Sequence, residues 1–178
     1  MEIIMLRHAY ASDGSVRALG RARDRFEKLE RPHFDAIIYA YSASAMETAK
    51  HFEGFLSRLP YMRVLGELEF PPHRYRLEEE YLILGESSLT RYYLRPDPVP
   101  RILADYARRA LEAVGRELFF FHTARALIIS HAPLVQQMTY ELFPERPILT
   151  NVLLSGCQGF RFQYFPRGHA ANLDFLTW

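Results

Sequence analysis

Three short apolar segments, separated by longer amphipathic ones, constrain the fold of this chain most strongly. Residues 2–6, 36–41 and 126–130 are nearly continuous in hydrophobicity and rich in β-branched or aromatic side chains. That composition is typical of strands buried on both faces of a sheet. Strands that alternate with helices predict a largely parallel sheet with helices on both sides, and therefore an α/β fold.

Apolar residues at helical spacing mark the stretches between and after these segments, and each set predicts a helix. The four sets are Val16, Leu19, Phe26 and Leu29; Ala49, Phe52, Leu56 and Leu59; Leu103, Ala107, Ala110, Val114 and Leu118; and Leu134, Val135, Met138 and Leu142. Residues 151–155, 159–165 and 173–178 are predicted to be further strands, antiparallel and at the edge of the sheet. The sequence thus predicts three layers, α/β/α, around a mostly parallel sheet.

The chain has the composition of one soluble domain that spans residues 1–178. It is 49% hydrophobic and 24% charged, and a chain of this size buries roughly 70% of its extended surface on folding. The candidate boundary within the chain is residues 70–100, a stretch with prolines at both ends and an acidic run at 78–80. We interpret this stretch as an excursion from the domain and the acidic run as a solvated helix face.

Charge and cysteine content exclude several classes of protein. The net charge of +1 does not favour nucleic acid as a partner. No segment approaches the roughly 20 apolar residues of a membrane span, and residues 1–10 lack the basic start of a signal peptide. Cys157 is the only cysteine, so no internal disulfide can form and a reducing cytoplasm is the expected location.

Polar residues follow each of the three buried segments, at the point where the predicted strand ends. Arg7 and His8 follow the first, a serine-rich turn with Ser44 follows the second, and His131 follows the third. Ligands bind beyond the carboxyl ends of strands in open α/β sheets, and two of these turns lead into predicted helices, whose N-termini attract anions. Two imidazoles beside a guanidinium favour a phosphate pocket with a histidine nucleophile.

Each of these residues, taken alone, also has a structural interpretation. Ser44 with Glu47 forms the spacing of a capping box at a helix start, and His131 can stand at an N-cap. It is the occurrence of polar groups at three strand ends together that favours a binding or catalytic site.

The two histidine segments resemble the histidine phosphatase superfamily of phosphoglycerate mutase-like proteins, and particularly its small phosphohistidine phosphatase (SixA-like) branch. The opening signature of that family is a strand followed by Arg-His-Gly, and residues 3–12 match it except that Ala9 replaces the glycine. The second family histidine follows a strand that ends in serine, as His131 follows Ser130. The resemblance covers most of the chain and implies a phosphoglycerate mutase-like fold.

The resemblance also implies roles for individual residues. His8 would attack phosphorus and become phosphorylated for a time, Arg7 would clamp the phosphoryl oxygens, and His131 with the backbone N–H of Ala132 would stabilise their charge. Such proteins need no metal or cofactor. The expected activity is hydrolysis of phosphohistidine or of a small phosphomonoester, so the expected partner is a phosphorylated small molecule or a phosphohistidine protein, with the oligomeric state left open.

One departure from the family leaves the activity open. Ser44 stands where the family places a second pocket arginine, and the neighbouring residues carry no positive charge either. Either another arginine takes its place, or the chain is a catalytically degenerate member that binds phosphate or a phosphoprotein. The arginines that are candidates for this position are Arg17, which we include among the phosphate-binding residues, and Arg21, Arg63, Arg74 and Arg76.

The acid that protonates the leaving group is also open. Many members of the family use a carboxylate after the third strand, and Glu67 is our first candidate, with Glu69 and His73 as alternatives. A phosphohistidine substrate needs less protonation than an alkoxide leaving group does, so activity without an acid is also compatible with the sequence.

Overall fold

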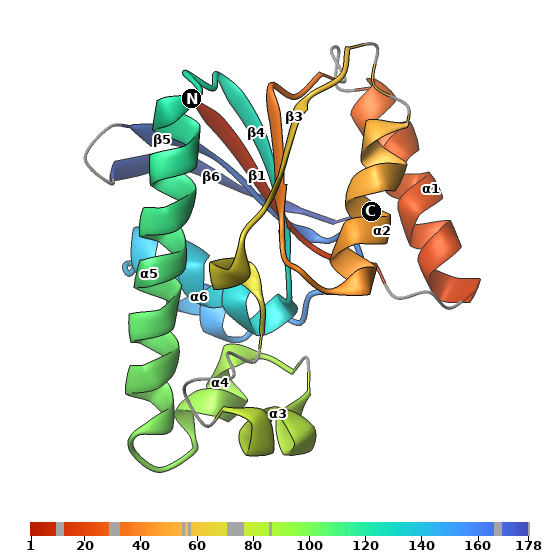
Figure 1. Ribbon diagram of the computed structural model, residues 1–178. Coiled ribbons are helices and arrows are strands. Elements are labelled where there is room, and N and C mark those ends of the chain that lie inside the picture. Colours follow the sequence, from red (N-terminus) through yellow and green to blue (C-terminus); the bar gives the residue numbers. More distant parts are fainter. Residues whose placement is uncertain are drawn as a thin grey trace.

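The computed structural model shows six strands in one mixed sheet, with the order β3-β2-β4-β1-β5-β6 (Figure 1). It describes residues 1–9, 13–28, 33–54, 56, 58–70, 77–85, 87–165 and 169–177, with the backbone alone for 13–16 and 25–28. The strands are β1 (Glu2–Arg7), β2 (Ala36–Tyr39), β3 (Tyr61–Val64), β4 (Arg125–Ser130), β5 (Gly159–Phe165) and β6 (His169–Leu176). The first four pair in parallel, while β5 and β6 are antiparallel additions at one edge. The predicted fold class is confirmed.

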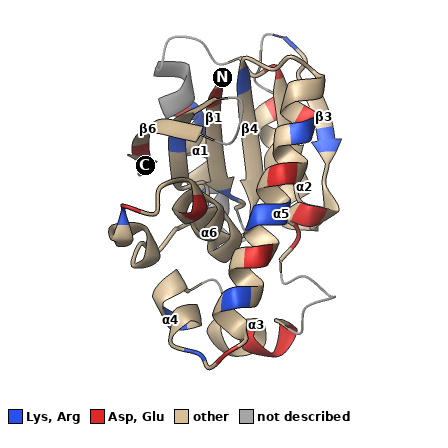
Figure 2. Ribbon diagram, turned by 90° about the vertical axis from the view of Figure 1, so that its left-hand side faces the viewer, with Lys and Arg blue, Asp and Glu red and all other residues tan. Residues whose placement is uncertain are grey.

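Helices cover both faces of this sheet. α1 (Asp13–Lys28) and α2 (Ala43–Glu53) lie on one side, and α5 (Val99–Phe120) and α6 (Ala132–Leu142) lie on the other (Figure 1). The predicted apolar stripe of α5 is fully or almost fully buried, whereas acidic and basic residues alternate along its visible outer side (Figure 2). Within the described part of the chain, no helix is long and apolar enough to cross a membrane.

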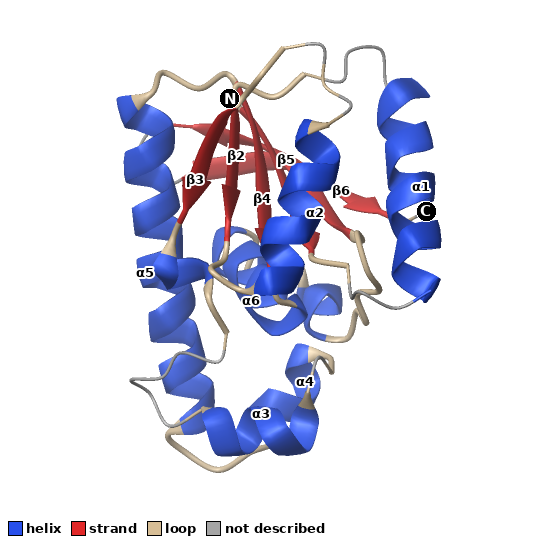
Figure 3. Ribbon diagram, turned by 45° about the vertical axis from the view of Figure 1, so that its right-hand side comes forward, coloured by secondary structure: helices blue, strands red, loops and turns tan. Residues whose placement is uncertain are grey.

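The excursion at residues 70–100 carries two short helices, α3 (Glu78–Leu84) and α4 (Leu89–Tyr93). Both lie beyond the carboxyl ends of the parallel strands, beside the lower half of α5 (Figure 3). The acidic run opens α3, with Glu78 and Glu79 exposed, as expected of a solvated helix face. Glu80 instead forms an ion pair with Arg95 at 2.5 Å between Oε2 and Nε, which ties α3 to the segment after α4.

Three local predictions are wrong. α2 ends at Glu53, where the N–H of Gly54 bonds to the carbonyl of Lys50, so Leu56 lies beyond it and Leu59 is 79% exposed. The N-cap of α2 is Ser42 and not Ser44, because the Ser42 hydroxyl accepts from the N–H of Ala45 at 3.4 Å.

The third concerns residues 151–155, which form an irregular loop and not a strand. The carbonyls of Val152 and Leu154 accept hydrogen bonds from the side chains of Gln136 and Arg7, respectively. Side-chain donors thus bind carbonyls that a strand would offer to a neighbouring strand.

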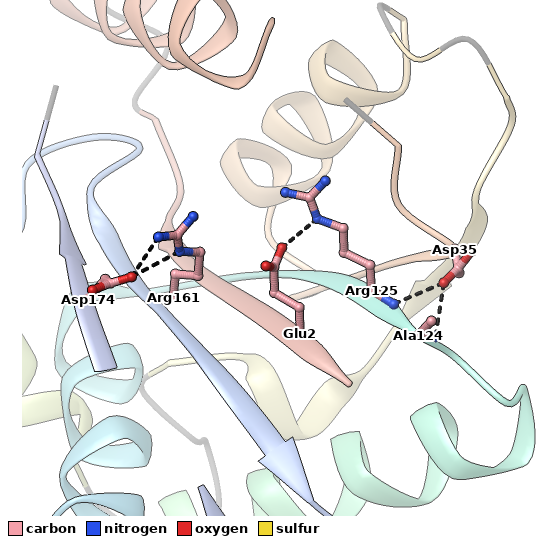
Figure 4. A network of polar contacts seen from close by, with 6 residues as sticks. All are labelled: Glu2, Asp35, Ala124, Arg125, Arg161 and Asp174. Atoms are coloured by element: carbon pink, nitrogen blue, oxygen red, sulfur yellow. Dashed lines mark hydrogen bonds and ion pairs between the residues drawn. The ribbon is translucent and has the colours of Figure 1, made fainter. Parts of the chain in front are cut away.

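Polar contacts at the amino ends of β1 and β4 stabilise the sheet away from its carboxyl edge (Figure 4). Glu2 forms an ion pair with Arg125 at 2.5 Å, and Asp35 Oδ2 accepts the backbone N–H groups of Ala124 and Arg125 at 2.9 Å each. These contacts connect the start of β4 to β1 and to the residue before β2.

Candidate active site

His8 and His131 lie next to each other because β1 and β4 are parallel neighbours. The register pairs Arg7 with Ser130, so the residue that follows each strand emerges at the same point of the sheet edge. The two imidazole centroids are 4.6 Å apart, with the rings nearly perpendicular. Both side chains are almost fully buried, at 2% exposure for His8 and 6% for His131. The N–H of His8 also bonds to the Ser130 carbonyl at 2.9 Å.

The surroundings of His8 favour one of its two neutral tautomers. Nδ1 lies 3.4 Å from the carbonyl oxygen of Ala9, and because that oxygen can only accept, this contact favours the tautomer with the proton on Nδ1 and the lone pair on Nε2. The N–H of Ala9 in turn donates to the Thr48 hydroxyl at 3.0 Å, and this hydroxyl donates to the carbonyl of Ser44 at 2.7 Å. Helix α2 therefore anchors the chain directly after His8.

Arg7 is held by the loop that follows residue 150. Its Nη1 donates to the Leu154 carbonyl at 2.6 Å, and its own carbonyl accepts the N–H of Cys157 at 3.0 Å. Burial raises the pKa of the Cys157 thiol to about 12, although the charges of Arg7 and Arg21 act in the opposite direction. The thiol therefore stays protonated at neutral pH and is not a second nucleophile at this site.

His131 stands at the N-cap of α6 with extended backbone geometry, and its side chain makes no capping hydrogen bond. Ala132 and Pro133 form the first turn of the helix. The partial positive charge at the start of α6 lies directly after His131, which favours an anion at this position.

A carboxylate also lies close to His131. Glu69 Oε1 is 3.8 Å from His131 Nε2, and the Glu69 side chain is 24% exposed. Glu67 lies two residues earlier, within the short 3-10 turn η1 (Gly66–Leu68), and its role as the acid stays a prediction. His73 lies outside the described residues.

Neither protein-family models nor curated proteins match this sequence. Solved structures do match it, over almost the whole chain. The protein histidine phosphatase SixA, complexed with tungstate, is 17% identical with a TM-score of 0.59, over 100% of this chain and 95% of that one. Phosphoserine phosphatase from Entamoeba histolytica, in complex with 3-phosphoglyceric acid, is 14% identical with a TM-score of 0.68, over 99% and 97%. Phosphoglycerate mutase from Bacillus anthracis str. Sterne is 11% identical with a TM-score of 0.69, over 99% and 92%.

This chain has the histidine phosphatase fold. The phosphoglycerate mutase-like fold implied by the two histidine motifs is thereby confirmed by an independent comparison of structures. At these sequence identities the likeness establishes the fold, and the activity has to be argued from the residues of this chain.

Ser44, which the resemblance predicts to stand in place of the second arginine of the histidine phosphatase motif, is half-buried in the first turn of α2. Among the candidate replacements, Arg63 on β3 is directed to Glu117 of α5, at 3.5 Å. Arg17 and Arg21 are exposed on α1. The charge of Arg21, like that of Arg7, acts to lower the pKa of the Cys157 thiol. Arg74 and Arg76 lie outside the described residues.

Two residues at the site were missed by sequence reasoning. Thr48 is 1% exposed although it is polar, and it lies on the buried face of α2 with Ala45, Ala49 and Phe52. A hydroxyl on the apolar stripe of a helix is a signal that it has a specific partner. Phe70 packs near His131 with ring centroids 6.5 Å apart. Its position next to Glu69 in the sequence was the only indication that Phe70 lies at the site.

Proposed function

We propose that this chain is a metal-independent phosphohydrolase that transfers the phosphoryl group of its substrate first to His8 and then to water. The observation that carries the proposal is the contact between the His8 and His131 rings at the end of two paired strands. The likeness to SixA and to phosphoserine phosphatase supports it. Phosphoryl transfer requires chiefly positioning and charge stabilisation, and we infer that the two histidines, Arg7 and the start of α6 supply both.

In the first step, the lone pair on His8 Nε2 forms a bond to phosphorus while the bond from phosphorus to the leaving oxygen breaks. Arg7, His131 and the start of α6 stabilise the negative charge on the phosphoryl oxygens. Glu69, in its protonated form, donates its proton to the leaving oxygen, which departs as an alcohol.

In the second step, a water molecule attacks the phosphorus of phosphohistidine. The carboxylate of Glu69 accepts a proton from this water, the nitrogen–phosphorus bond breaks, and its electron pair returns to Nε2 of His8. Inorganic phosphate leaves, and the carboxyl group is again protonated for the next substrate.

The position of Glu69 favours a phosphomonoester over phosphohistidine as the substrate. An alkoxide leaving group needs a proton in the transition state, whereas a leaving imidazole depends on one much less. A carboxyl group beside His131 supplies that proton, so it has a chemical use with a phosphomonoester.

The test is hydrolysis of 4-nitrophenyl phosphate, of a small alkyl phosphate and of phosphohistidine by the wild type and by His8→Ala. His169→Ala serves as the matched control, because His169 is an exposed histidine on β6. We expect turnover by the wild type and by His169→Ala, and loss of at least about 10³-fold in His8→Ala. Phosphate binding without turnover in the wild type would instead establish the binding-only alternative.

A further inference from the structure

The turn that carries Glu69 is held by two side-chain hydroxyls from elsewhere in the fold. The Tyr106 hydroxyl lies 2.7 Å from the carbonyl oxygen of Glu69 and 3.2 Å from that of Gly66. The hydroxyl of Ser130 donates to the carbonyl of Leu68, between them in the chain, at 2.6 Å. Two buried hydroxyls thus lie within hydrogen-bond distance of three carbonyls of one short turn, and the single proton of the Tyr106 hydroxyl is shared between those of Glu69 and Gly66.

These two donors connect the turn to the parts of the fold that fix His131. Ser130 is the last residue of β4 and directly precedes His131, and its side chain is fully buried. Tyr106 lies on the buried side of α5, at 6% exposure, beside Leu103, Ala107 and Ala110. The backbone of Glu69 and the ring of His131 are therefore both fixed relative to the carboxyl end of β4.

The hydroxyl groups are not needed for packing at either position. Burying a hydroxyl costs free energy unless it is hydrogen-bonded, and phenylalanine or alanine would fill these positions without that cost. What the hydroxyls add is direction, because each hydrogen bond orients one carbonyl of the 66–69 turn.

We propose that Tyr106 and Ser130 are positioning residues that place the Glu69 carboxyl beside His131, where it serves the leaving group. The inference rests on the proposed function, since it assigns a purpose to Glu69 in that reaction. The inference identifies Glu69, and not Glu67, as the acid. It also gives the Tyr106 hydroxyl on α5 an indirect part in proton transfer, because this hydroxyl holds the turn that carries Glu69.

The expected signature is an effect that depends on the leaving group. General acid catalysis contributes about 10²–10⁴-fold, and a misplacement of about 1 Å can cost about 10²-fold. Phenyl phosphate leaves as a basic phenolate and benefits from the acid, whereas 4-nitrophenyl phosphate has a similar shape and a much better leaving group. Both substrates share the second step, in which Glu69 also acts, but kcat/KM reports only the steps up to the formation of phosphohistidine. Loss of positioning should therefore lower kcat/KM for phenyl phosphate while kcat/KM for 4-nitrophenyl phosphate changes little.

The experiment compares Tyr106→Phe and Ser130→Ala with Tyr92→Phe, a matched control. The Tyr92 hydroxyl also donates to a backbone carbonyl, that of Gly85, at 2.7 Å, but it does not hold the 66–69 turn. We expect Tyr106→Phe and Ser130→Ala to lower kcat/KM for phenyl phosphate about 10–100-fold. For 4-nitrophenyl phosphate, and for Tyr92→Phe with both substrates, the change should stay within about 3-fold.

A double-mutant cycle with Glu69→Gln separates positioning from a general loss of stability. If Tyr106 acts through Glu69, then Tyr106→Phe has no further effect on phenyl phosphate once the carboxyl is gone. Equal losses of kcat/KM with both substrates, or an undiminished effect in the Glu69→Gln background, would overturn the inference while the proposed function stands. A wild type that hydrolyses neither ester would overturn both.

Discussion

The Thr48 hydroxyl accepts the backbone N–H of Ala9 at 3.0 Å and so joins helix α2 to the residue after His8. It donates at the same time to the carbonyl of Ser44, at 2.7 Å. A buried threonine on one helix thus connects the chain after β1 with the start of α2. The histidine at the end of β1 is therefore oriented by the neighbouring helix as well as by its own strand.

Thr48→Val keeps the shape of the side chain and removes this connection. A buried N–H without its acceptor costs about 1–3 kcal/mol, so we expect a loss of unfolding free energy in that range, together with a lower kcat. Thr139→Val is the control, because the Thr139 hydroxyl donates to Val135 within its own helix. Denaturant unfolding and kinetics measure both effects, and a Thr48→Val enzyme with unchanged kcat would contradict this role.

Ser44→Arg should restore a guanidinium at the position where the histidine phosphatase motif carries one. A hydrogen bond to a charged group is worth about 1.5–3 kcal/mol, so we expect kcat/KM to rise by at least about 10-fold. Met46→Arg places the same charge two residues along in α2, on a side chain that is 37% exposed. A positive charge near a helix N-terminus destabilises both variants alike. Equal kcat/KM values for the two variants would argue against a vacant cation position at Ser44.

The Cys157 thiol should be inert in the native protein. Burial raises its pKa to about 12, so the reactive thiolate is scarce at pH 8, and its fraction grows only as the pH approaches that value. We expect a colorimetric disulfide reagent to label the thiol slowly in the folded protein and rapidly in denaturant. Rapid labelling of the native state, or loss of turnover on labelling without unfolding, would contradict this account.

Asp35→Ala should affect stability without affecting catalysis. Asp35 accepts two backbone N–H groups at the start of β4, at the opposite end of the strand from His131. We expect a loss of about 2 kcal/mol in unfolding free energy with kcat unchanged. Asp174→Ala removes a carboxylate that pairs with Arg161 on the surface, and this loss should cost less than about 1 kcal/mol. A fall in kcat for Asp35→Ala at a temperature where the variant is fully folded would be the contrary result.

The sheet and the convergence of the two histidines were predictable because buried parallel strands have a strong sequence signal. Residues 3–6 and 126–129 are apolar throughout, so the strands and the residues that follow them could be located. β3 gave no such signal, because it has only four residues and both Arg63 and Val64 are exposed. The loop at 151–155 has the composition of a strand, and only the distant donors Arg7 and Gln136 determine where its carbonyls bond.

The contacts around Glu69 could not be predicted for the same physical reason. Glu69, and not Glu67, lies beside His131. Which of the two carboxylates takes this place depends on where a single 3-10 turn, Gly66–Leu68, begins and ends. The carbonyls of Leu68 and Glu69, at the end of this turn, accept hydrogen bonds from Ser130 and Tyr106, which are far away in the sequence. Local patterns carry no information about such bonds.

The most direct test of the account is to identify the residue that carries the phosphoryl group during turnover. The enzyme is mixed with a fast phosphoryl donor such as 4-nitrophenyl phosphate and quenched under alkaline conditions, and its peptides are then analysed by mass spectrometry. We predict one acid-labile phosphoryl group on the peptide with His8, retained in His169→Ala and absent in His8→Ala. A phosphoryl group on any other residue, or hydrolysis that continues in His8→Ala at the wild-type rate, would contradict the central claim.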